Sequence, residues 1–135
     1  MNVYKQLKEA HSAKFNSFPM FFAFDRKQFD EGLQKLNTTE TQVLKIGGGG
    51  FIRASDLRDF QALIDDMSAE LERNLSDPNF FYYAVRYELN NHEYSYTYDA
   101  GEALRALGLS FSDLTETQAA ILSRAAREIQ AENND

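Results

Sequence analysis

The sequence predicts an α+β fold, in which five or six helices pack on a small, mostly antiparallel sheet of three or four strands. Two kinds of segment support this prediction. In some, apolar residues recur every three or four positions; others are short, apolar or alternating, and bounded by glycine or polar residues. The 135 residues, 43% of them hydrophobic, can bury a core without disulfides. We therefore expect residues 1–135 to form a single compact domain, with a frayed tail at about 131–135.

The N-terminal part predicts a helix, a strand and a second helix. The first helix spans 2–15, and the apolar run 18–24 is typical of a buried strand. Asp25 then begins a helix that reaches Leu36, because Asp25 and Gln28 have the spacing of a capping box.

Two further strands, 43–46 and 51–53, flank four glycines: Gly47, Gly48, Gly49 and Gly50. Glycine adopts positive φ without steric cost, so we expect a hairpin turn. As an alternative, consecutive backbone N–H groups can bind an anion, with Arg53 as the charge partner. A P-loop is excluded, because it requires Gly-Lys-Ser/Thr where this chain has Phe-Ile-Arg.

The region that follows has the clearest helical pattern of the chain, with Ser55 as the expected N-cap. Its apolar residues share one face of a helix: Leu57, Phe60, Ile64, Met67, Leu71 and Leu75.

The segment 77–99 holds six of the seven tyrosines. Asp77 followed by proline is a helix start signal, which favours a helix over 78–90, although alternating apolar residues also fit a strand. The following residues alternate between tyrosine and serine or threonine over 94–98, which predicts a strand with one aromatic face.

Two helices complete the expected fold. Asp99 and Glu102 have capping-box spacing before a short helix over 100–107, which Gly108 closes. A last helix spans about 115–130.

Net charge is −7, and it is unevenly distributed. Residues 1–53 carry eight Lys and Arg against five Asp and Glu, whereas residues 54–135 carry six against sixteen. An acidic surface repels phosphates, so direct nucleic-acid binding is disfavoured and a basic protein partner is favoured. There is no cysteine, no apolar run of membrane-spanning length and no signal-peptide pattern, so we expect a cytoplasmic protein outside the membrane.

The candidate catalytic residues are Glu88, His92 and Glu93. On a continuing helix, Glu88 and His92 lie four residues apart on one face, where they can share a proton or a metal. No complete metal motif is present, so we predict neither a metal site nor a cofactor. The alternative is structural: His92 and Asn91 bind the end of the helix. Asn91, Tyr94 and Tyr96 are candidate partner-binding residues, because tyrosine suits both a core edge and a protein interface.

Four segments carry a resemblance to a known family: FFAF (21–24), IGGGGFIR (46–53), YELNNHEY (87–94) and YDAGEALRALGL (98–109). Over Val3 to Leu109 the chain resembles a family of small bacterial proteins of unknown function, found in gut bacteria and on their phages or mobile elements. The resemblance implies a cytoplasmic, mobile-element setting and brings no catalytic residues.

These observations leave three hypotheses of function. The first is a non-catalytic accessory module that binds a protein partner through an acidic or tyrosine-rich surface. The second is a small metal-assisted or acid–base hydrolase centred on Glu88, His92 and Glu93. The third is an inhibitor that mimics nucleic acid on a basic enzyme.

Overall fold

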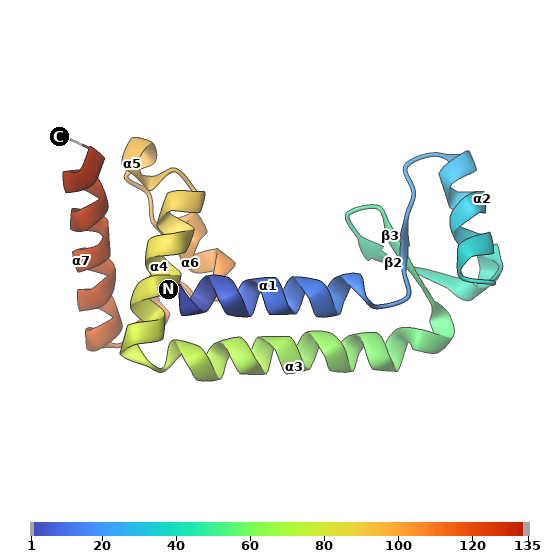
Figure 1. The fold of residues 1–135 in the computed structure, drawn as a ribbon, viewed down its shortest axis with the longest axis horizontal. Coiled ribbons are helices and arrows are strands. Elements are labelled where there is room, and N and C mark those ends of the chain that lie inside the picture. Colours follow the sequence, from blue (N-terminus) through green and yellow to red (C-terminus); the bar gives the residue numbers. More distant parts are fainter. Residues whose placement is uncertain (1, 134–135) are drawn as a thin grey trace. The chain divides into compact units, whose positions relative to one another are not determined.

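The structure is a computed structural model, and it describes residues 2–133. Contacts within the chain gather into two compact units, one made of residues 1–10 with 68–135 and the other of residues 11–67. Helices α1 and α3 contribute residues to both (Figure 1). In chain order the elements are α1 Val3–Asn16, β1 Phe21–Phe22, α2 Arg26–Lys35, the 3-10 turn Glu40–Gln42, β2 Val43–Gly47, β3 Gly50–Arg53, the 3-10 turn Ala54–Asp56, α3 Leu57–Leu75, α4 Pro78–Asn91, α5 Tyr94–Thr97, α6 Gly101–Ala106, the 3-10 turn Phe111–Asp113 and α7 Glu116–Asn133.

The α+β class is confirmed. The described residues form seven α-helices and one antiparallel sheet of three strands, in the order β1-β3-β2. None of these helices is both long and apolar enough to cross a membrane. The expected single domain stays a prediction. Helix α7 continues to Asn133, so it includes the first part of the expected frayed tail, whereas 134–135 lie outside the described residues.

The unit formed by residues 11–67 is built around aromatic contacts between the sheet and α2. Phe21 of β1 pairs with Phe51 of β3, and their rings stack with centroids 5.2 Å apart. Phe29 of α2 meets both rings edge-on. Gly32, one turn further along α2, lies against the Phe21 ring: a Cβ placed there would be 2.0 Å from Phe21 Cδ2. The ring therefore occupies the space that any other side chain would need.

The expected hairpin between the second and third strands is confirmed. Gly47 pairs with Gly50, and the two residues between them, Gly48 and Gly49, have φ of +59° and +81°. Two positive φ angles in a two-residue turn match the right-handed twist of the strands. The ring of Phe24 lies over Gly49, where it would contact an added Cβ.

The other unit is organised around α4, which contacts α5, α6 and α7. The predicted helix start is confirmed, because the Asp77 carboxylate accepts hydrogen bonds from the N–H groups of Asn79 and Phe80. Fully buried apolar side chains on α4 are each worth about 1.5–3 kcal/mol of hydrophobic stabilisation. The core of this unit contains Tyr4, Leu75, Phe80, Phe81, Ala84, Val85, Leu89, Ala103, Leu104, Leu107, Leu122, Ala125 and Ile129.

Three expected caps differ in detail. The Asp25 carboxylate accepts from the N–H of Gln28 as predicted, but the Gln28 side chain accepts from the N–H of Phe24. The N-cap expected at Ser55 is wrong, because a 3-10 turn leads directly into α3. The Asp99 carboxylate accepts from the N–H of Gly101, without the reciprocal bond expected from Glu102.

The strand predicted over 94–98 is wrong, because this segment forms the one-turn helix α5. Both flanking residues, Glu93 and Tyr98, have positive φ (56° and 54°), so neither has the extended backbone of a strand. A strand needs a neighbouring strand for its backbone hydrogen bonds, whereas a helical turn supplies its own. The turn also brings the rings of Tyr94 and Tyr98 together, with centroids 6.1 Å apart.

Replacing Glu93 with glycine is expected to stabilise the protein by about 0.5 kcal/mol, because relief of the left-handed strain exceeds the entropy cost of glycine. Glu93→Ala keeps the strain and serves as the control. Urea unfolding followed by circular dichroism measures both free energies of unfolding. If Glu93→Gly were no more stable than Glu93→Ala, the left-handed backbone at position 93 would not be strained.

Candidate functional site

Helix α4 alternates pairs of buried and less buried residues with a period of four. Ala84 and Val85 are fully buried, as are Glu88 and Leu89 one turn later. Between these pairs lie two rows of accessible side chains at helical spacing: Tyr82, Arg86 and Asn90 in one row, and Tyr83, Tyr87 and Asn91 in the other. Residues four apart share a helix face, so the sequence YYAVRYELNN places Glu88 in the core and both rows toward the outside.

The two rows form one wall of an open groove of about 820 Å³. Its other walls come from Glu128 and Glu132 of α7 and from Asn2, just before α1. We call this feature the α4–α7 groove.

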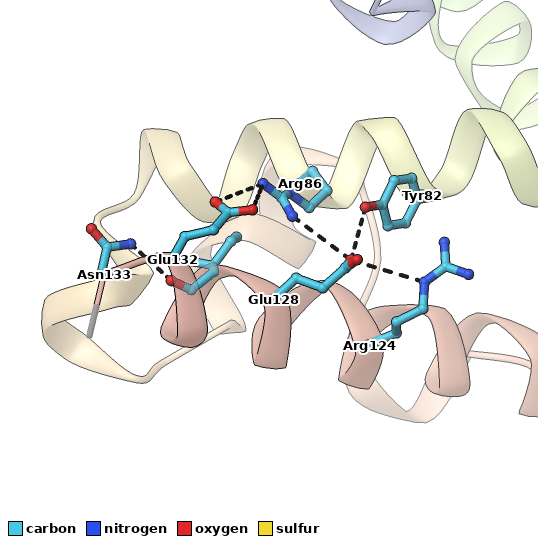
Figure 2. Close-up of polar contacts among 7 residues, drawn as sticks. Tyr82, Arg86, Arg124, Glu128, Glu132 and Asn133 are labelled. Atoms are coloured by element: carbon cyan, nitrogen blue, oxygen red, sulfur yellow. Dashed lines mark hydrogen bonds and ion pairs between the residues drawn. The ribbon is translucent and has the colours of Figure 1, made fainter. Parts of the chain in front are cut away.

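Polar contacts between α4 and α7 hold one side of the groove in place (Figure 2). Arg86 donates two hydrogen bonds from Nη2 to the carboxylate of Glu132, at 2.8 and 2.9 Å. The Tyr82 hydroxyl donates to Glu128 Oε1 at 2.8 Å. Arg124 lies over the Tyr82 ring, with its Cζ 4.3 Å from the centroid. Hydrogen bonds to charged groups are stronger than neutral ones, so these side chains have little conformational freedom.

The same contacts determine the electrostatics of the groove. The hydrogen bond to the Glu128 carboxylate raises the pKa of Tyr82, so its hydroxyl remains a donor. Burial lowers the pKa of Arg86, but its hydrogen bonds and attraction to Glu132 outweigh this effect and raise the pKa overall. Arg86 therefore stays charged and bound to α7.

Other groups in the groove have hydrogen-bonding capacity to spare. The hydroxyls of Tyr83 and Tyr87 and the side-chain amides of Asn90 and Asn91 make no hydrogen bond to any residue within 2–133. Amides provide both donors and acceptors, and each tyrosine adds a flat apolar face.

Among residues 2–133, Glu88 is the one charged residue that is buried, and it lies at the centre of a polar cluster. Its Oε1 accepts hydrogen bonds from the Tyr4 hydroxyl at 3.0 Å and from Lys8 Nζ at 2.8 Å. The Glu88 side chain is fully buried, whereas 42% of the Lys8 side chain is exposed. Lys8 Nζ also lies 5.2 Å from the centroid of the Tyr87 ring. A carboxylate without solvent needs such a cation to offset the cost of desolvation.

His92 lies between two carboxylates. Its Nε2 is 3.4 Å from Glu88 Oε2, and its Nδ1 is 3.4 Å from Glu102 Oε2. Glu88 Oε2 is buried and has no hydrogen-bond partner of proper geometry. The predicted proximity of Glu88 and His92 is therefore present, while Glu93 is exposed and forms no ion pair within the described chain. Across residues 2–133, no group of three or more His, Asp or Glu side chains is arranged to hold a metal ion.

Because the hydroxyl of Tyr4 is buried, the free energy of unfolding should fall at alkaline pH. Burial, the charge of Glu88 and the hydrogen bond to Glu88 together raise the pKa of Tyr4 above its ordinary value. The folded state therefore favours the neutral hydroxyl, and this contribution is complete below the unfolded pKa of about 10 and is lost as pH rises above it.

We expect the free energy of unfolding to fall more steeply above pH 10 in the wild type than in Tyr4→Phe, by up to about 1.4 kcal/mol per pH unit. Urea unfolding at a series of pH values provides the measurement. Parallel slopes for the two proteins would show that Tyr4 ionises as freely in the folded state as in the unfolded one.

The other predicted site residues fall in different places. The four glycines form the hairpin, and Arg53 donates to the Asp56 carboxylate at 2.8 Å and to the backbone carbonyl of Leu36. Asn91 lines the groove. The Tyr94 hydroxyl accepts a long hydrogen bond from Gln130, and 83% of Tyr96 is exposed.

Sequence reasoning missed the contributions of α1 and α7. Tyr4 and Lys8 lie four residues apart on α1, a spacing that places them on one face, whereas the neighbouring apolar residue Val3 is exposed. Glu128 and Glu132 show the same spacing on α7. This spacing indicates that the two residues share a face of the helix, but it does not identify the helix against which that face packs.

Residues 3–129 of the chain match DUF7659, described as a family of unknown function. The chain belongs to this family. The DUF7659 match includes all of α4, the Glu88 cluster and Glu128, whereas Asn2 and Glu132 lie outside it. It extends beyond Leu109, where the resemblance noted from the sequence ends. The bacterial, phage and mobile-element setting stays a prediction. No curated protein and no solved structure matches the chain.

Proposed function

We propose that this DUF7659 protein is a non-catalytic accessory module that binds a protein partner in the α4–α7 groove. The observation that carries this proposal is the pair of accessible rows on α4, which present three tyrosines, an arginine and two asparagines to one groove. Tyrosine and arginine are enriched in the centres of protein interfaces, because they combine large contact area with hydrogen bonding.

The state of the groove before binding supports the same proposal. Arg86 and Tyr82 are already held by α7, so binding would not have to order them. The unpaired amides and hydroxyls supply hydrogen bonds for a partner's backbone.

The hydrolase hypothesis has weaker support. Both ring nitrogens of His92 face carboxylates of the same chain, and Glu88 is enclosed by Tyr4 and Lys8. A general base must reach a substrate proton directly or through one water molecule. The geometry of this cluster fits a role in holding α4 and α6 together better than a role in proton transfer to a substrate.

A site-specific crosslinking experiment tests the proposal. A photo-crosslinking amino acid replaces Tyr83 in the groove or, as a control, Asn79, which is exposed on the same helix but does not line the groove. In cells of the source organism we expect a discrete protein adduct from position 83 and none from position 79. The double variant Asn90→Ala/Asn91→Ala should reduce the adduct, whereas Asn79→Ala should not. Equal adducts at both positions, or no adduct at either, would refute the groove as a partner site.

A further inference from the structure

The α4–α7 groove already binds arginine side chains of its own chain in two ways. The guanidinium of Arg86 lies against the Glu132 carboxylate with two short hydrogen bonds, and that of Arg124 lies over the Tyr82 ring (Figure 2). Charge-assisted hydrogen bonds to a carboxylate and stacking on an aromatic ring are two ways in which proteins bind arginine; here both bonds to Glu132 come from one nitrogen, Nη2.

In the neighbouring row, the Tyr83 ring has no cation over it within the described residues, whereas Lys8 Nζ already lies over the Tyr87 ring. The Tyr83 ring meets the Tyr82 ring edge-on, with centroids 5.4 Å apart, and Tyr87 follows one turn later. Their hydroxyls and the amides of Asn90 and Asn91 are unpaired within the described part of the chain. A second guanidinium would find the face of Tyr83 here and the acidic side chains of α7 across the groove.

Charge favours a cationic occupant over an anionic one. The groove is lined by one arginine and two glutamates, and Arg124 Nε lies 3.9 Å from Glu128 Oε1, so the preference for a cation comes from the charge of the unit that surrounds the groove. The unit that contains it has thirteen acidic and seven basic residues, whereas the unit of residues 11–67 has eight and seven. Such a field attracts basic segments and accelerates their association at low ionic strength.

We infer that the groove recognises an arginine within an extended, basic segment of the partner protein. In this arrangement the guanidinium lies on the Tyr83 ring beside the α7 carboxylates, while Asn90 and Asn91 bind the backbone of the segment. The inference rests on the proposed function, because it names the chemistry of the partner at the same groove.

Short peptides test it directly. The probe is a fluorescein-labelled, end-capped peptide of seven residues, five alanines and two arginines; two matched peptides carry lysine or the uncharged isostere citrulline. By fluorescence anisotropy in low salt, we expect the arginine peptide to bind at least tenfold more tightly than the citrulline peptide and several-fold more tightly than the lysine peptide. Amide shifts in NMR spectra should concentrate on residues 82–91.

Variants separate groove binding from general attraction to an acidic protein. Tyr83→Ser should weaken arginine-peptide binding about tenfold, and Asn79→Ala should leave it unchanged. Equal affinity for arginine and lysine peptides, or an Asn79→Ala effect as large as that of Tyr83→Ser, would overturn the inference.

The crosslinking result distinguishes this failure from failure of the proposed function. A partner captured at position 83 whose crosslinked segment contains no arginine would leave the groove as a partner site and overturn the arginine assignment. If the peptide binds only in the groove and arginine is preferred over lysine and citrulline, the result supports arginine recognition by the groove, whatever the partner's identity.

Discussion

Replacing Lys8 with methionine is expected to destabilise the protein by about 3 kcal/mol, more than the replacement of its partner in Glu88→Gln, which should cost about 1–2 kcal/mol. The asymmetry follows from burial. Without Lys8, the carboxylate of Glu88 stays fully buried and loses the cation 2.8 Å away. Without the Glu88 charge, Lys8 can turn its partly exposed ammonium toward water, and the glutamine oxygen can still accept from Tyr4. Chemical unfolding followed by circular dichroism gives both values.

The double variant and a surface control make this prediction specific. In Lys8→Met/Glu88→Gln the buried charge is gone, so the double variant should be more stable than Lys8→Met alone. Lys5→Met on the same helix removes only an exposed pair with Glu9, 4.0 Å apart, and should change stability by less than about 0.5 kcal/mol. If the double variant lost as much stability as the two single variants together, the buried carboxylate of Glu88 would not need Lys8 for its stabilisation.

Gly32→Ala is expected to destabilise the protein by about 2–3 kcal/mol, although glycine-to-alanine changes inside helices usually stabilise by up to about 1 kcal/mol. The sign reverses because the new methyl group would overlap the Phe21 ring, at 2.0 Å from its Cδ2. That ring cannot move freely, since it stacks on Phe51 and contacts Phe29. Urea unfolding of Gly32→Ala measures the cost.

A second substitution tests whether the Phe21 ring is the cause. Phe21→Leu should cost less in the Gly32→Ala background than in the wild type, because the smaller side chain leaves room for the methyl group. Gln34→Ala, at an exposed position of the same helix, should be neutral or slightly stabilising. A stabilised Gly32→Ala variant would show that α2 does not lie on Phe21 as described.

Much of the local structure follows from the sequence because its signals are local. Asp77 with proline after it starts α4, since the carboxylate and the missing N–H act within one turn. The glycines between β2 and β3 form the turn because two of them must take positive φ. Gly108, with φ of +74°, closes α6 for the same reason.

The strand prediction for residues 94–98 failed for a non-local reason. Alternating tyrosines satisfy the period of a strand, but a strand forms only where another strand offers its backbone groups. The three strands of the described chain all belong to residues 11–67, and α5 belongs to the other unit. A one-turn helix between two left-handed residues satisfies its own backbone instead.

The candidate site, too, could be predicted from the sequence only where its residues lie close together in the chain. Spacing on one helix correctly placed Glu88 beside His92, because residues four apart share a face. The same spacing does not place Tyr4 and Lys8, which are 84 and 80 positions away from Glu88. It also does not place Glu128 and Glu132 opposite Arg86.

The amino-acid sequence by itself determined the start of α4, the glycine turns, the shared face of Glu88 and His92 and the acidic balance of this chain, because these depend on residues within a few positions of one another or on composition alone. Only the tertiary structure decided which faces meet. Packing α1 and α7 against α4 gave the buried carboxylate its cation and formed the groove between Arg86 and the α7 glutamates. Contacts between distant segments depend on how all the helices bury their apolar surface together, and no local pattern encodes that result.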